Sequence, residues 1–141
     1  MKRISPLFVL LAAGFISDGL RCSHPHVAPP RPRAYAARRP IRVYHGKASY
    51  YGGDFHGRKT ASGEVFDQHG LTAAHKTWPF GTVCRVIHRR NGKAVIVRIN
   101  DRGPFIQGRI LDLSYEAARR IDGVAEGVMD VRIEILEWGK R

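Results

Sequence analysis

The sequence predicts a mainly β fold, a small closed barrel of five or six short strands with one short helix. Apolar and polar residues alternate over short stretches of the second half of the chain, which is the period of a half-buried strand. Gly, Pro and Asn-Gly turn signals separate these stretches. Because short strands expose unpaired edges, closure into a barrel is the architecture that such a pattern favours.

The chain of 141 residues divides into three parts. Residues 1–19 combine a basic start, an apolar core and small residues near its end, which predicts a secretory signal rather than a membrane span of the mature protein. Residues 20–45 are rich in Pro, Arg and Ala and predict a disordered linker, because prolines disfavour regular helices and central strands. Residues 46–141 form the expected domain, with no metal and no cofactor.

The formal charge is +12, and residues 20–45 contribute six arginines and no acid. A basic segment favours an anionic partner, and cell-envelope surfaces fit an exported chain better than nucleic acid does. We therefore expect the protein in the periplasm or cell envelope. Cys22 is an alternative lipidation site, but Arg21 fits a lipobox poorly. Cys84 alternates with apolar neighbours and is expected in the core.

The elements of the domain follow from local patterns in chain order. Asn91-Gly92 is a strong hairpin signal between two strands. Residues 114–121 predict a short helix, with Ser114 as its N-cap and Gly123 at its end. The expected strands cover residues 47–52, 82–89, 93–100, 109–113 and 129–138.

Polar residues suited to carbohydrate chemistry gather in a Gly-flanked loop and at three strand ends. A carboxyl group can protonate a glycosidic oxygen, polar donors can hold a sugar, and aromatic rings suit its apolar face. The candidates are Glu64, His75, Asp101, Asp112, Thr60, Ser62, Asn100, Arg102, Tyr50 and Tyr51.

Spacing alone leaves a structural interpretation open for each candidate. Asp101 can form a turn with its own backbone or pair with Arg102. Glu64 can be an exposed loop residue, and His75 can bond a backbone carbonyl. Asp112 can accept from backbone N–H groups near the helix start. Ligand spacing for a metal, a phosphate-binding loop and a nucleophile motif are not visible in the sequence.

Three longer stretches, taken together, resemble the rare lipoprotein A (RlpA-like) family. They are KASYYGGDFHGRKTASGEVFDQHGLTAAHKTWPFGT, NGKAVIVRINDRGPFIQGRILDLSYEAA and VRIEILEWG, and their motifs follow the family's order from Gly46 to about Gly139. The resemblance implies a six-stranded double-psi β-barrel. It also implies a lytic transglycosylase that cuts peptidoglycan between N-acetylmuramic acid and N-acetylglucosamine and leaves a 1,6-anhydro end.

The resemblance also implies roles for individual residues. Asp101 would be the general acid and then the base toward the muramyl 6-hydroxyl, while Glu64 and His75 would position the substrate or stabilise its transition state. Asp112 matches the position of a key aspartate in the related expansin barrels. The family is associated with glycan strands that lack stem peptides and with daughter-cell separation. We expect a monomer whose partner is the glycan strand. The family name also implies an outer-membrane lipoprotein, for which Cys22 would be the lipidation site.

Two alternatives to a lyase use the same residues. One is an expansin-like module that binds or loosens the wall without cleaving it. The other is a hydrolase in which Asp101 and Asp112 act as an acid–base pair, with carboxyl groups about 6.5–9.5 Å apart for an inverting reaction. The product distinguishes them, since a lyase leaves anhydro ends, a hydrolase leaves reducing ends and a binder leaves none.

Overall fold

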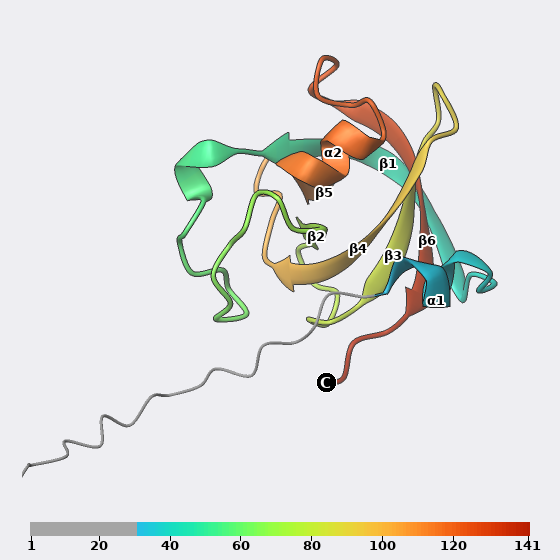
Figure 1. Cartoon of the computed structure of the whole chain (residues 1–141), viewed down its shortest axis with the longest axis horizontal. Helices are drawn as coiled ribbons and strands as arrows, with labels where there is room; N and C mark the ends of the chain where they lie inside the picture. Colours follow the sequence, from blue (N-terminus) through green and yellow to red (C-terminus); the bar gives the residue numbers. More distant parts are fainter. Residues whose placement is uncertain (1–30) are drawn as a thin grey trace, which may run out of the picture.

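Six strands and two short helices make up residues 31–141, the part of the chain that this computed structural model describes (Figure 1). The strands form a closed barrel in the order β1-β5-β2-β4-β3-β6, and the pairing of β6 with β1 completes it. The elements are α1 (Pro32–Ala36), β1 (Arg42–Tyr51), a 3-10 turn (Gly53–Phe55), β2 (Thr72–Ala74), β3 (Val83–His88), β4 (Ala94–Asp101), β5 (Arg109–Ser114), α2 (Tyr115–Arg120) and β6 (Met129–Glu137).

Strand pairing confirms the predicted mainly β barrel. β1 pairs with β5 and β2 pairs with β4 in parallel, whereas the other four neighbouring pairs are antiparallel. Because parallel neighbours cannot be joined by a tight hairpin, the chain crosses the barrel between them. This arrangement brings strands that are far apart in the sequence to one end of the barrel, where polar side chains meet.

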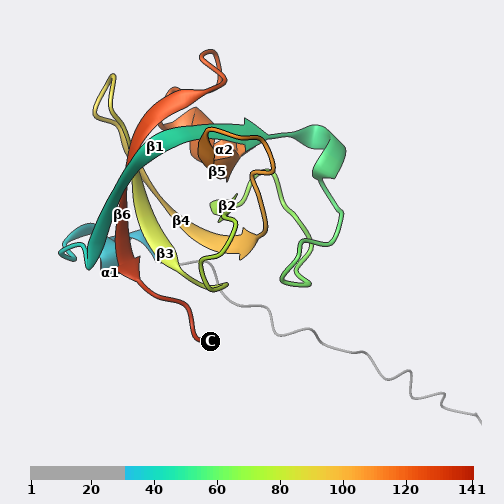
Figure 2. The ribbon, with the colours of Figure 1, turned by 180° about the vertical axis from the view of Figure 1, so that it is seen from behind.

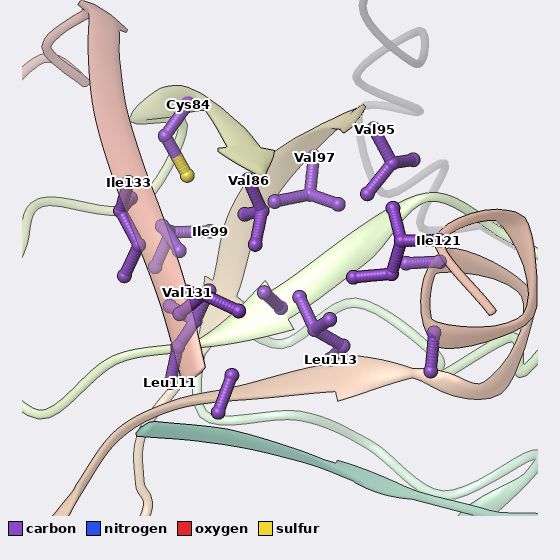
Figure 3. Close-up of a cluster of buried hydrophobic side chains, with 14 of the residues drawn as sticks. Cys84, Val86, Val95, Val97, Ile99, Leu111, Leu113, Ile121, Val131 and Ile133 are labelled. Carbon is purple, nitrogen blue, oxygen red and sulfur yellow. The ribbon is translucent and has the colours of Figure 1, made fainter. Parts of the chain in front are cut away.

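Alternating apolar residues of the strands fill the barrel (Figure 3). Cys84 lies in this core with a free thiol, as predicted, and burial raises the pKa of that thiol to about 12. Burial of each large aliphatic side chain contributes about 1.5–3 kcal/mol to folding. The core side chains include Val86, Val95, Val97, Ile99, Leu111, Leu113, Val131, Ile133 and Ile135.

Helix α2 covers one end of the barrel and begins as predicted. The Ser114 hydroxyl accepts a hydrogen bond from the Ala117 amide at 3.3 Å, which makes Ser114 the N-cap. The end of the helix differs from the prediction, because Asp122 rather than Gly123 takes the left-handed conformation, with φ 54°. Gly123 instead allows close packing, since a Cβ there would run into the Met129 side chain.

The prediction of a disordered linker up to residue 45 is wrong for its second half. Helix α1 forms because Pro32 stands in its first turn, where the missing N–H leaves no hydrogen bond unmade. β1 begins at Arg42, two residues after Pro40, so the barrel starts before the expected boundary at Gly46. The expected signal segment, Cys22 and the first part of the linker lie outside the described residues.

Helix α1 is tied to the barrel by polar contacts. The Arg85 guanidinium of β3 donates to the carbonyls of Tyr35 and Ala36 at 3.0 and 2.7 Å. The Tyr35 hydroxyl and the Arg38 guanidinium both donate to the Glu137 carboxylate at the end of β6. Within residues 31–141, no helix is both long enough and apolar enough to cross a membrane.

Candidate functional site

Two aspartates lie on either side of the short strand β2. Ala74 of β2 is in register with Asp101 of β4 and with Asp112 of β5, and Asp112 is in register with Ser49 of β1. We call Ser49, Asp112, Ala74 and Asp101 the aspartate row. Because Ala74 contributes only a methyl group, no bulky side chain separates the two carboxylates along the row.

Backbone groups orient the Asp101 side chain. Its Oδ1 atom accepts hydrogen bonds from the amides of Ala61 and Arg102 at 2.9 and 2.8 Å. Within residues 31–141, its Oδ2 atom accepts no hydrogen bond and the carboxylate has no ion pair. The turn interpretation of Asp101 is therefore right for one oxygen, while the other oxygen is available to a ligand.

Asp112 has closer side-chain neighbours than Asp101 has. The Ser49 hydroxyl donates to its Oδ1 atom at 2.6 Å, and Arg109 Nε lies 3.7 Å from that oxygen. Gly103 has φ +136°, and a Cβ placed on it would lie 3.9 Å from both Asp112 Oδ2 and Ala74 Cβ. The glycine therefore keeps the space beside the row free of a side chain.

Tyr51 places a buried hydroxyl near both carboxylates. Burial raises the pKa of Tyr51 above its ordinary value, and the charges of Asp101 and Asp112 raise it further. The ring packs against Phe66, with centroids 4.5 Å apart, and the hydroxyl has no hydrogen-bond partner among the described residues. The phenol therefore stays protonated and is a free donor beside the aspartate row.

Tyr50 lies on the opposite face of β1. Its hydroxyl donates to the Val124 carbonyl at 3.3 Å, and its ring meets the Tyr115 ring edge-on at 6.0 Å. Tyr50 also packs against the buried core. The structure thus brings Tyr51 to the row and places Tyr50 on the other face of β1, because successive side chains of a strand point to opposite faces. The expected role of Tyr50 in substrate binding stays a prediction.

Glu64 joins the site through an ion pair that the sequence did not predict. The Arg98 guanidinium donates to both Glu64 carboxylate oxygens at 2.7 and 2.9 Å, and Asn100 Nδ2 donates at 3.1 Å. Arg98 and Asn100 are buried, and Arg98 Nε and Asn100 Oδ1 have no partner among the described residues. Glu64 is therefore a fixed anion at the end of β4 and not an exposed loop residue.

The loop that carries Glu64 folds back on itself. The Thr60 amide donates to the Glu64 carbonyl at 2.7 Å, and the hydroxyls of Thr60 and Ser62 lie 2.9 Å apart. The Ser62 amide donates to the Asn100 carbonyl at 3.3 Å. These contacts fix the loop on the end of β4 and hold the Ala61 amide against Asp101.

His75 is a neutral donor at neutral pH. Burial, together with the smaller effects of the Arg102 and Lys76 charges, lowers the pKa of His75 to about 4. Its Nδ1 atom accepts from the amides of Thr77 and Trp78 at 3.1 and 3.0 Å, so the ring hydrogen is on Nε2. The imidazole stacks on the Trp78 indole, with centroids 3.7 Å apart and 7° between the planes.

Arg102 holds the turn that contains His75. Its guanidinium donates to the carbonyls of Trp78 and His75 at 2.9 and 3.3 Å and lies 3.8 Å from the Phe80 ring centroid. These contacts hold the turn in place, and the expected role of Arg102 in substrate binding stays a prediction. Its backbone amide, rather than its charge, contacts Asp101.

Sequence reasoning missed three residues of the site. Ser49 lies two residues before Tyr51, and Arg98 lies two residues before Asn100, so each shares a strand face with a predicted site residue and could have been found by that spacing. Gly103 carries no local signal beyond its turn. Among residues 31–141, no group of three His, Cys, Asp or Glu side chains is arranged to hold a metal ion.

A family model described as a lytic transglycolase matches residues 43–133. The chain belongs to this family. An RlpA of Synechocystis, named a probable endolytic peptidoglycan transglycosylase, is 55% identical over 96 residues, which cover 68% of this chain and 30% of that protein. The endolytic peptidoglycan transglycosylase RlpA of Vibrio cholerae is 53% identical over 95 residues, covering 67% and 36% of the two chains. The chain thus spans about a third of these relatives' length.

Two solved structures share the barrel. Streptomyces papain inhibitor superposes with a TM-score of 0.58 at 20% identity, covering 71% of this chain and 99% of that one. An expansin of Clavibacter michiganensis gives 0.56 at 20% identity, covering 71% and 53%. These likenesses, with the family match, confirm the predicted double-psi β-barrel.

Proposed function

We propose that this domain is an endolytic peptidoglycan lytic transglycosylase. It would cleave the β-1,4 bond between N-acetylmuramic acid and N-acetylglucosamine and leave a 1,6-anhydro end. The observation that carries the proposal is the aspartate row, in which Asp101 has one oxygen fixed by two amides and the other unbonded within the described residues. The name of the relatives supports the same reaction.

Asp101 carries the proton through both halves of the reaction. Its carboxyl group donates a proton to the glycosidic oxygen while the bond from C1 of the muramyl residue to that oxygen breaks. The muramyl 6-hydroxyl then bonds to C1 and returns its proton to Asp101. The proton is restored, water does not enter the products, and a single carboxyl group is sufficient.

Three neighbours support this chemistry. His75 offers a neutral Nε2–H donor, and Tyr51 offers a protonated hydroxyl. Both can hold sugar hydroxyls or charge that develops on oxygen without competing for the proton of Asp101. Glu64 fixes the loop whose Ala61 amide orients Asp101, so its role is positioning.

The finer setting of the reaction belongs to the same proposal. We place the protein, as a monomer, in the periplasm or cell envelope, where it acts on strands that lack stem peptides during wall remodelling or daughter-cell separation. The arginines of residues 20–45 favour an anionic envelope surface. One of them, Arg38, is already paired with Glu137, so the contribution of the described part of this segment is smaller than its charge suggests.

An expansin-like binder is the second candidate, since a solved expansin shares this barrel and another such structure contains cellohexaose. Mass spectrometry of purified glycan strands after incubation with the protein separates the candidates. We expect 1,6-anhydro-ended fragments from the wild type and a loss on the order of 10²–10⁴-fold in Asp101→Asn.

A matched control is Asp130→Asn, the same substitution on an exposed strand residue away from the row. It should leave the fragment yield unchanged. Reducing ends in place of anhydro ends would show a hydrolase. Binding of strands by the wild-type protein without any fragments would show a binder and would contradict the proposed lyase.

A further inference from the structure

Phe105 is the most exposed large apolar side chain among those of residues 31–141, with 85% of its surface accessible. It lies in the loop between β4 and β5, four residues after Asp101. Aromatic rings of this size normally find cover in the fold, because they contribute most by burial. We therefore ask whether a ligand of the neighbouring polar site covers this exposed ring.

The ring stands next to the aspartate row. A Cβ placed on Gly103 would lie 3.7 Å from Phe105 Cε2, 3.9 Å from Ala74 Cβ and 3.9 Å from Asp112 Oδ2. The side chain that Gly103 lacks thus leaves a gap that the Phe105 ring borders on one side and the row on another. This gap is where a group held by the carboxylates would meet the ring.

The other wall of the site is also partly apolar at its rim. The loop after β1 exposes Phe55 and Val65 to 50% and 61%. Figure 2 shows this loop and the loop after β4 at the same end of the barrel. The carboxylates therefore lie between two loops that each present apolar surface.

We propose that Phe105 is a stacking platform for one pyranose ring of the glycan, next to the ring whose bond the aspartate row addresses. This inference rests on the proposed function and adds a binding subsite to it. A pyranose has an apolar C–H face that packs on an aromatic ring, and hydroxyls at its edge that carboxylates accept from. Gly103 gives the sugar room to reach both.

Local charge favours a sugar over a lipid surface as the occupant. The aspartate row places two carboxylates near the ring, of which Asp112 lies 3.7 Å from Arg109 and Asp101 has no ion pair within residues 31–141. Carboxylates repel the anionic headgroups of a membrane surface. The same carboxylates are good acceptors for the uncharged hydroxyls of a sugar. The ring and the row therefore match a single ligand that is apolar on one face and rich in hydroxyls at its edge.

The experiment compares Phe105→Ala and Phe105→Trp with the wild type on purified glycan strands. Loss of the ring should raise KM, and weaken binding of the strands, by roughly tenfold with little change in kcat, because about 1.4 kcal/mol of apolar burial is lost. Phe105→Trp should restore KM, and its fluorescence should change when strands are added. Ile106→Ala is the matched control, since this neighbour is also exposed, and it should leave KM unchanged.

Binding measured apart from cleavage separates this inference from the proposed reaction. If the wild type binds strands but does not cleave them, the lyase fails while the loss of binding in Phe105→Ala still supports the platform. If Phe105→Ala binds and cleaves as the wild type does, the platform is wrong. If Phe105→Ala loses the binding of anionic phospholipid vesicles that the wild type shows, and still binds glycan strands as the wild type does, the platform is also wrong and the ring contacts a membrane.

Discussion

Two glutamates each pair with an arginine of a barrel strand, and their surroundings differ. On the β3–β6 side, Glu134 accepts from Arg85 at 2.7 Å, and the other guanidinium nitrogen of Arg85 donates to backbone carbonyls of α1. At the site, Glu64 accepts from Arg98 and Asn100, yet Arg98 Nε and Asn100 Oδ1 are buried without partners among the described residues. The polar atoms of the first pair therefore all have partners or contact solvent, whereas the second pair includes buried atoms without a hydrogen bond among the described residues.

Buried polar atoms without partners are concentrated near the site. Such atoms cost about 1–3 kcal/mol each, so a fold retains them only where something else compensates. Among the described residues these atoms belong to Tyr51, Thr72, Arg98, Asn100 and Arg109, with His88 as a sixth, whose ring lies 3.1 Å from the Glu126 carboxylate.

The largest stability effect is expected in the core. Ile133→Ala removes a fully buried side chain of β6 and should lower the free energy of unfolding by about 2–5 kcal/mol, measured by denaturant titration. Cleavage per folded molecule should be unchanged, because the site lies at the ends of other strands. A parallel loss of kcat below the unfolding transition would show that the two regions are coupled.

Exchanging the two glutamates for glutamine tests the comparison directly. Glu134→Gln and Glu64→Gln should each cost about 1–3 kcal/mol of stability, because each leaves a largely buried guanidinium with a weaker acceptor. Only Glu64→Gln should also lower glycan cleavage, by about tenfold or more, since its loop orients Asp101. Equal losses of cleavage in both variants would contradict the distinction.

Acid pH should lower the free energy of unfolding through His75. The pKa of His75 is about 4 in the fold against an ordinary value of 6.5, so the unfolded chain takes up the proton first. The contribution of His75 to stability is complete above pH 6.5 and falls as the pH drops toward 4. His75→Asn keeps an acceptor for the two amides and should show a flatter pH profile of unfolding free energy between these values.

The smallest effect is expected at the exposed pair of Lys47 and Asp130, whose charged atoms lie 3.6 Å apart. Asp130→Asn should change the free energy of unfolding by less than about 1 kcal/mol, because water and salt screen exposed ion pairs. Thermal melts at low and high salt provide the measurement. A change larger than about 1 kcal/mol would contradict the expectation that exposed ion pairs contribute little to the stability of this barrel.

Local signals in the sequence predicted local structure well. Ser114 and the Asn91-Gly92 pair were sufficient to place a helix start and a hairpin, because capping and turn formation involve only a few neighbouring residues. β2 was missed, since three residues are too few for a period to show. Helix α1 was missed because prolines were taken only as helix breakers, although the first turn accepts them.

The site could be predicted in its residue types but not in its contacts. Asp101 and Asp112 flank Ala74 only through strand register, which residues on three separate strands determine together. Glu64 and Arg98 are 34 positions apart, and the Arg102 guanidinium donates to the carbonyls of His75 and Trp78. Such pairings depend on how the chain crosses the barrel, so no local pattern reveals them.

The contacts of α1 have a mechanical consequence. Residues 35–38 hydrogen-bond to Arg85 of β3 and Glu137 of β6. These are the two strands that contribute no residue to the aspartate row. Tension applied to the chain ahead of α1 is therefore first resisted by side chains on that side of the barrel. The four strands that carry the aspartate row do not take part in these contacts. A pulling force on the N-terminal side would therefore act on β3 and β6 before it changed the positions of the two carboxylates.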